Sequence, residues 1–182
     1  MRIAVTGAHG VGKTTLIDDF VAAYPRFARE QEPYWALAQQ GVAFADGATV
    51  PDLEQQLMAS CDMILQAEAG DVVFDRCPMD FVAYLEVVAE GEGFEWEPAG
   101  RLLSKMDAAI AALDLIAFVP IVEPDEIGVA IEEPRLRARV DRRLKALLRR
   151  DELGLLADGQ RVVEVTGDRA RRVERLAGAL GV

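Results

Sequence analysis

The chain has little of the chemistry that marks zinc sites and disulfide scaffolds. Its 182 residues include one histidine and two cysteines, Cys61 and Cys77, which form no CxxC pair. One histidine and two separated thiols do not make a common zinc ligand set. We therefore expect both thiols to be free, as in proteins of a reducing cytoplasm.

Long apolar runs are also lacking. The longest uncharged apolar run, Leu115 to Val122, is far shorter than the roughly 20 residues that a helix needs to cross a bilayer. The N-terminus carries one arginine and soon turns glycine-rich, which is unlike a signal peptide. We expect a cytoplasmic protein with no membrane partner.

Positive charge is scarce and unevenly placed. The chain has 20 Lys+Arg against 31 Asp+Glu, a net charge of −11. This charge disfavours binding to nucleic acid polymers or anionic lipid, and with the small size it disfavours a nucleic-acid motor. Between Glu30 and Glu97 there are fifteen acidic residues and one basic residue, whereas residues 134–150 hold eight basic and one acidic. Such a basic island favours an anionic ligand held within the protein.

The length and a hydrophobic content of 51% fit one packed domain over residues 1–182. Apolar, β-branched segments predict strands at 2–6, 26–32, 71–75, 115–120 and 162–165. Helical periodicity predicts helices at 12–24, 52–69, 79–90, 99–113, 134–150 and 168–180. Strands that alternate with helices pair in parallel through right-handed crossovers, so we expect a three-layer α/β/α fold.

The strongest motif is the segment GAHGVGKT at residues 7–14, which fits G-x-x-x-x-G-K-[ST] between a predicted strand and a predicted helix. Glycines let backbone N–H groups turn around an anion, and the helix N-terminus adds positive dipole character. Lys13 would reach the β- and γ-phosphates, and the Thr14 hydroxyl would ligate Mg²⁺. The motif predicts nucleotide contacts at Gly7, His9, Gly10, Val11, Gly12, Lys13, Thr14 and Thr15.

Asp75 and Arg76 follow a buried strand, where α/β folds place groups that face a ligand. Asp75 is suited to hold Mg²⁺ or to orient an acceptor hydroxyl, and Arg76 is suited to bridge donor and acceptor phosphates. A salt-bridged strand end is the alternative for both residues.

The stretch DRCPMDFVAY at residues 75–84 resembles the D-R-Y-x-x-S-x-x-A-Y signature of thymidylate kinases, with Cys77 in place of the tyrosine and Asp80 in place of the serine. It also resembles the E-R-S region of deoxynucleoside kinases. The dipeptide Glu32-Pro33 is similar to an E-P dipeptide of deoxynucleoside kinases, whose Glu acts as base toward the sugar hydroxyl. This implies that Glu32 binds or deprotonates an acceptor hydroxyl; an exposed acidic loop residue is the alternative.

The resemblance extends to ribosylnicotinamide-kinase-like domains and to the AAA-type ATP-binding proteins grouped with them. It implies a five-stranded parallel sheet of order 2-3-1-4-5 and a helical lid at about residues 121–150. Arg135 and Arg139 of the basic helix would close over the phosphates, although a solvated charged face explains them too. Gly167 and Asp168 would contact adenine after the last strand, or serve only as a turn and helix cap.

Two functions remain open. The first is an ATP- and Mg²⁺-dependent kinase of a small nucleoside- or nucleotide-like acceptor, an enzyme in which Lys13, Asp75, Arg76 and Glu32 act together. The second is a nucleotide-binding switch or regulatory ATPase that acts through a protein partner, since no glutamate adjoins Asp75 to activate water. No N-K-x-D tetrapeptide is present, which favours ATP over GTP. The thymidylate kinase resemblance leaves a homodimer open.

Overall fold

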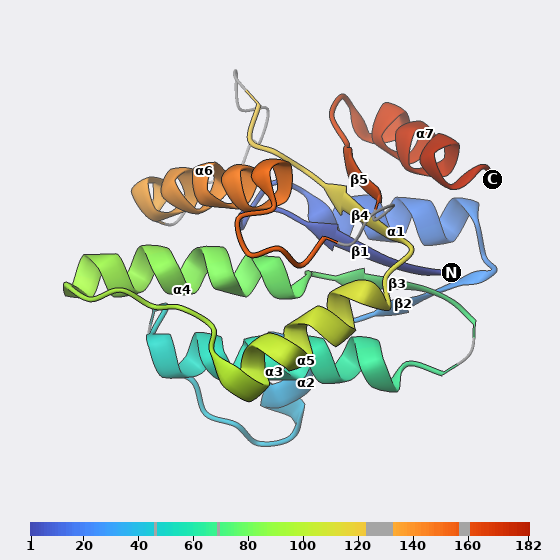
Figure 1. Cartoon of the computed structure of the whole chain (residues 1–182). Coiled ribbons are helices and arrows are strands. Elements are labelled where there is room, and N and C mark those ends of the chain that lie inside the picture. The colour runs from blue at the N-terminus through green and yellow to red at the C-terminus, as the bar shows by residue number, and fades with distance from the viewer. Residues whose placement is uncertain (46, 69, 123–132, 157–160) are drawn as a thin grey trace.

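A parallel sheet forms the centre of the computed structural model, which describes residues 1–45, 47–68, 70–122, 133–156 and 161–182 (Figure 1). The five strands lie in the order β2-β3-β1-β4-β5 and every pairing is parallel. They are β1 (Arg2–Thr6), β2 (Phe27–Glu30), β3 (Asp71–Asp75), β4 (Leu115–Phe118) and β5 (Arg161–Glu164). The predicted fold class and strand order are therefore confirmed.

Seven helices are present in the described ranges, and each predicted helix is among them. They are α1 (Lys13–Ala23), α2 (Pro33–Gln39), α3 (Val50–Gln66), α4 (Pro78–Glu92), α5 (Gly100–Ala111), α6 (Pro134–Arg150) and α7 (Arg169–Leu180). Helix α3 begins earlier than expected because Thr49 caps it by accepting a hydrogen bond from the Asp52 N–H. Pro33 begins α2. The N–H groups of a first helical turn have no acceptor within the helix, so the missing N–H of proline costs no helical hydrogen bond there.

The helices form two layers around the sheet. Helices α1 and α7 pack together on one side, and α3, α4 and α5 lie on the other (Figure 1). Helix α4 also packs against α6, so it lies between α3 and α6. The predicted lid, about residues 121–150, therefore includes α6, whereas its residues 123–132 lie outside the described part of the chain.

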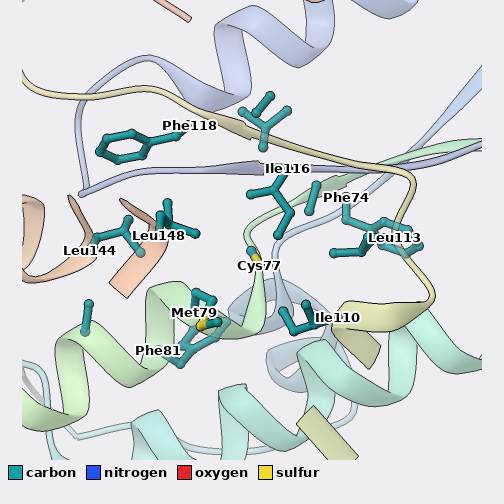
Figure 2. Packing of buried hydrophobic residues seen from close by; sticks show 14 of the residues in the cluster. Phe74, Cys77, Met79, Phe81, Ile110, Leu113, Ile116, Phe118, Leu144 and Leu148 are labelled. Carbon is teal, nitrogen blue, oxygen red and sulfur yellow. The ribbon is translucent and has the colours of Figure 1, made fainter. Parts of the chain in front are cut away.

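The core that holds α4 and α6 in place is apolar. Figure 2 shows Ile116 and Phe118 of β4 facing Phe81 of α4 and Leu144 of α6, with Ile110 of α5 nearby. All five side chains are at most 1% exposed. Each such burial stabilises the fold by about 2 kcal/mol relative to exposure. This packing fixes the start of α4, which carries part of the site described below.

Both cysteines are free and buried, as expected. Burial raises the pKa of the Cys61 thiol to about 12, so this side chain stays protonated and packs as a small apolar group. Within the described ranges, no helix combines the length and the apolar character that crossing a membrane requires.

Candidate functional site

Two neighbouring strands bring the predicted residues to one edge of the sheet. Strands β1 and β3 pair in parallel with Val5 opposite Asp75, and the Arg76 N–H donates to the Val5 carbonyl at 3.1 Å. The loop that follows β1 and the residues that end β3 therefore lie together at the carboxyl edge. Parallel α/β sheets commonly bind ligands at this edge.

The loop between β1 and α1 needs glycine at its first position. Gly7 has φ of 151°, and a Cβ there would lie 2.4 Å from the Val119 carbonyl oxygen. Gly10 and Gly12 also have positive φ, and Gly12 directly precedes α1. The backbone thus curls tightly into the N-terminus of a helix, which is the geometry that cradles phosphate groups.

Lys13 lies inside this curl rather than in solvent. Its side chain is buried, and its Nζ donates to the carbonyl oxygens of Gly7 and Ala8 at 2.9 Å each. Burial, followed by the nearby positive charge of Arg76, lowers the pKa of Lys13 to about 8. An anion bound against the loop would stabilise the charged form of this amine.

Thr14 and Asp75 provide two oxygen donors side by side. The Thr14 hydroxyl donates to Asp75 Oδ2 at 2.7 Å, while the buried Oδ1 has no hydrogen-bond partner in the described ranges. Burial raises the pKa of Asp75, although the hydrogen bond from Thr14 opposes this. A hydroxyl beside an unsatisfied carboxylate oxygen fits Mg²⁺, which prefers oxygen ligands.

These two residues would not hold a metal alone. Among the residues that the structure describes, no group of three or more His, Cys, Asp or Glu could form a metal site. Mg²⁺ commonly keeps several waters and binds through one or two protein oxygens plus substrate phosphates. The donor set therefore fits an ion that arrives with a nucleotide.

Arg76 is held in a strained and partly buried position. Its φ is 93°, a conformation that costs a non-glycine residue about 1–3 kcal/mol. Its Nε donates to Glu32 Oε1, and its guanidinium lies over the rings of Phe81 and Tyr84 at 5.8 and 5.5 Å. Its Nη1 is buried with no hydrogen-bond partner in the described part of the chain. This nitrogen therefore has hydrogen-bonding capacity that the described part of the protein does not use.

Glu32 follows β2 and faces Arg76, so the predicted residues from β2 and β3 meet. Burial would raise the pKa of Glu32, but the charge and hydrogen bond of Arg76 outweigh it and hold this pKa below the ordinary value. The carboxylate is therefore ionised at neutral pH. Oε1 accepts from Arg76, and such a carboxylate is able to accept a hydroxyl proton as well.

Asp80 fastens the phosphate loop to the start of α4. Its fully buried carboxylate accepts hydrogen bonds from the Thr6 hydroxyl (2.6 Å), the Gly7 N–H (3.0 Å) and the Cys77 N–H (2.8 Å). Arg76 Nη1 lies 3.6 Å from its Oδ1. The aspartate that departs from the thymidylate kinase signature thus joins β1, the loop and the Asp75-Arg76 turn.

Helix α6 reaches the loop through an arginine that the sequence analysis missed. Arg137 is 4% exposed, and its Nε donates to the His9 carbonyl at 2.8 Å. Arg139 instead pairs with Glu90 at 2.7 Å, and Arg135 is exposed at the first turn of the helix. Phosphate contact by Arg135 and Arg139 stays a prediction. Helical spacing from Val140 would have placed Arg137 on the buried face.

Helix α7 supplies a second arginine that the sequence analysis missed. Arg172 Nη1 donates to the Val11 carbonyl at 2.7 Å, and its Nε donates to the Gly167 carbonyl at 2.8 Å. It thereby joins the loop to the turn after β5. Asp168 caps α7 by accepting from the Arg171 N–H, so its side chain is already used as a helix cap.

Two cavities flank the phosphate loop. The first, the α7-side cavity, has a volume of about 380 Å³ and is lined by Gly10, Val11, Gly12, Thr15, Leu16, Asp19, Gly167, Asp168, Arg169 and Arg172. The second, the α3-side cavity, has a volume of about 370 Å³, and its lining includes His9, Tyr34, Phe44, Asp52, Gln56, Arg76, Phe81, Tyr84 and Glu133. Cavities of this size accept small organic ligands. The loop is therefore placed between two candidate ligand sites.

Replacing Asp80 by alanine tests its role at this junction. Asp80→Ala leaves three buried donors without their acceptor, so we expect the free energy of unfolding to fall by about 3–5 kcal/mol. Urea denaturation followed by circular dichroism measures this. Asp107→Ala, at an exposed position of α5, is the matched control and should change stability by no more than about 0.5 kcal/mol. Equal losses in the two variants would contradict the role given to Asp80.

The lowered pKa of Lys13 predicts proton uptake on nucleotide binding. At pH 8.5 the amine, with a pKa of about 8, is mostly neutral. A bound triphosphate raises this pKa, so binding takes up most of one proton. Calorimetry of metal-free ATP binding in buffers of different ionisation enthalpy measures the uptake. Lys13→Arg, whose side chain keeps its proton, should show none. Binding by the unaltered protein without uptake would show that Lys13 is fully charged beforehand.

Solved structures with the same fold include several kinases. Deoxyadenosine kinase from M. mycoides with bound dATP has a TM-score of 0.66 at 14% identity, and the match covers 100% of each chain. The NadR protein in complex with NR has a TM-score of 0.66 at 18% identity, covering 100% of this chain and 52% of that one. Thymidylate kinase from Candida albicans has a TM-score of 0.63 at 14% identity, covering 99% and 90%. These likenesses confirm the kinase-like P-loop fold.

No curated protein sequence matches the chain. A family model described as an AAA domain, AAA_28, does match, over residues 2–172. This span includes the phosphate loop, the Asp75-Arg76 turn and Arg172. The chain therefore belongs to this family of AAA domains.

Proposed function

We propose that the protein is an ATP- and Mg²⁺-dependent kinase that transfers a phosphoryl group to a hydroxyl of a small nucleoside- or nucleotide-like acceptor. The observation that carries the proposal is the meeting of Lys13, Asp75 and the Arg76–Glu32 pair at one edge of the sheet, between two cavities. A simple nucleotide-binding switch needs the loop and the metal ligands, but it does not need a partly buried Arg–Glu pair beside a second cavity.

The α7-side cavity is the proposed ATP site. It is continuous with the loop residues Gly10 and Gly12, and the turn at Gly167 and Asp168 offers backbone groups for a base. Arg172 lines the same cavity and joins this turn to the loop. The relatives support an adenine nucleotide, because the deoxyadenosine kinase structure contains dATP and a NadR structure contains AMP-PNP.

Thr14 and Asp75 are the proposed Mg²⁺ ligands. When bound, the ion would neutralise charge on the phosphate oxygens. Lys13, whose Nζ donates to the Gly7 and Ala8 carbonyls, would contribute a second positive charge. Arg137 is the arginine of α6 best placed to add a third, since it already contacts the loop at the His9 carbonyl. Arg135 and Arg139 are proposed to assist from the same helix.

The α3-side cavity is the proposed acceptor site. Glu32 would orient the acceptor hydroxyl and take its proton, while the hydroxyl oxygen forms a bond to the γ-phosphorus and the bond to ADP breaks. Arg76 Nη1, which lies 3.6 Å from Asp80 Oδ1 and has no hydrogen-bond partner in the described ranges, would donate to the transferring phosphoryl group. In this proposal the protein forms no covalent bond to either substrate. The rate enhancement would come from positioning the two substrates and from stabilising the charge on the transferring phosphoryl group.

The direct test is release of ADP from Mg-ATP in a coupled assay across nucleosides, nucleoside monophosphates and nicotinamide riboside. We expect an acceptor-dependent rate that falls by at least about 100-fold in Lys13→Ala, because charge stabilisation of the phosphoryl group is lost. ATP hydrolysis that is slow and independent of every acceptor would contradict the kinase and favour the partner-regulated switch.

Glu32→Gln separates the acceptor step from nucleotide binding. The amide keeps the size of the side chain but cannot take a proton, so we expect kcat to fall by about 10²–10⁴-fold. The dissociation constant for ATP should change little, because Glu32 pairs with Arg76 and is not among the residues that line the α7-side cavity. Steady-state kinetics and calorimetry measure the two quantities. Glu30→Gln, at the end of β2, is the matched control. A weakened ATP affinity with unchanged kcat would refute this assignment.

A further inference from the structure

The α3-side cavity has almost no positive charge. Its described lining contains one arginine, Arg76, and two carboxylates, Asp52 and Glu133. The guanidinium of Arg76 already pairs with Glu32 and lies near Asp80. A ligand in this cavity therefore meets a net negative surface.

The segment that supplies most of the cavity lining offers no further cation. From Glu30 to Glu97, which includes α2, α3 and α4, Arg76 is the single lysine or arginine. In α6, Arg137 donates to the phosphate loop and Arg139 pairs with Glu90. Arg76 is thus the single lysine or arginine among the described residues that line the cavity.

The cavity walls suit a planar ring. Tyr34 and Phe44 stack with centroids 4.6 Å apart, while Phe81 and Tyr84 line the cavity from α4. Gln56 adds an amide that both donates and accepts hydrogen bonds. Aromatic faces with one amide bind a heterocyclic base, and neither feature neutralises a phosphate.

We propose that the acceptor enters this cavity without a phosphate, as an unphosphorylated nucleoside-like molecule whose base is neutral or positively charged. The inference rests on the proposed function and narrows it. A nucleoside monophosphate would bring a dianion into a surface that already has excess negative charge. The hydroxyl oxygen forms the new bond to the γ-phosphorus, ADP leaves, and the hydroxyl proton passes to Glu32. The product then carries a phosphate of its own and is a poor acceptor for a second transfer.

The test compares each nucleoside with its own 5′-monophosphate at fixed Mg-ATP, with the phosphorylated product measured by mass spectrometry. We expect kcat/KM to be at least about 100-fold higher for the nucleoside of a productive pair. Equal or better use of the monophosphate would overturn the inference while leaving the proposed kinase intact. Phosphorylation of neither member of any pair would instead overturn the proposed function.

A charge variant tests whether electrostatics causes this selection. Gln56→Arg adds a cation to the cavity and should reduce the preference for the nucleoside by about tenfold. Gln55→Arg, at an exposed position of the same helix outside the cavity lining, is the matched control and should leave the preference unchanged. Circular dichroism checks that both variants are folded.

The selectivity should also weaken at high ionic strength, because salt screens the repulsion of the monophosphate. A preference unaffected by Gln56→Arg and by salt would show that shape rejects the monophosphate, and the charge argument would fail.

Discussion

The structure of this site depends on one buried carboxylate. Asp80 accepts hydrogen bonds from the end of β1, from the first residue of the phosphate loop and from the residue that caps α4. It therefore fixes two chain segments about 70 residues apart in the sequence. Because a buried carboxylate is costly unless its oxygens are satisfied, these bonds must form together. The loop and the Asp75-Arg76 turn are therefore joined into one unit through this carboxylate.

The two cationic side chains beside that unit, Lys13 and Arg76, have different partners. Lys13 donates to loop carbonyls, and burial followed by the charge of Arg76 lowers its pKa, whereas Arg76 is paired with Glu32. The site thus has an amine on the loop whose acceptors are uncharged carbonyls, and an arginine beside the α3-side cavity that a carboxylate neutralises. An anionic donor on one side and an uncharged or cationic acceptor on the other is the combination that this arrangement favours. Holding Arg76 in this position requires a positive φ, which strains the backbone locally.

Local patterns predicted much of the fold and part of the site. The phosphate loop was readable because its glycines, lysine and threonine are consecutive, and Asp75 because a buried strand directly precedes it. The strand order was predicted from the resemblance to kinases, because no local sequence pattern shows which distant strands pair with each other. Arg137 and Arg172 were missed because their roles depend on how α6 and α7 pack against the loop. Helical spacing could have identified Arg137 as buried, but not the carbonyl that it contacts.

The most direct test of this account follows the terminal phosphate of ATP itself. ATP labelled in its γ-phosphate is given to the protein with Mg²⁺ and a nucleoside, and the label is divided between the nucleoside product and inorganic phosphate. If the site is built for transfer between two cavities, most of the label appears in the nucleoside product, because bound acceptor excludes water from the phosphoryl group. Label released only as inorganic phosphate, at a rate that no acceptor alters, would contradict the account.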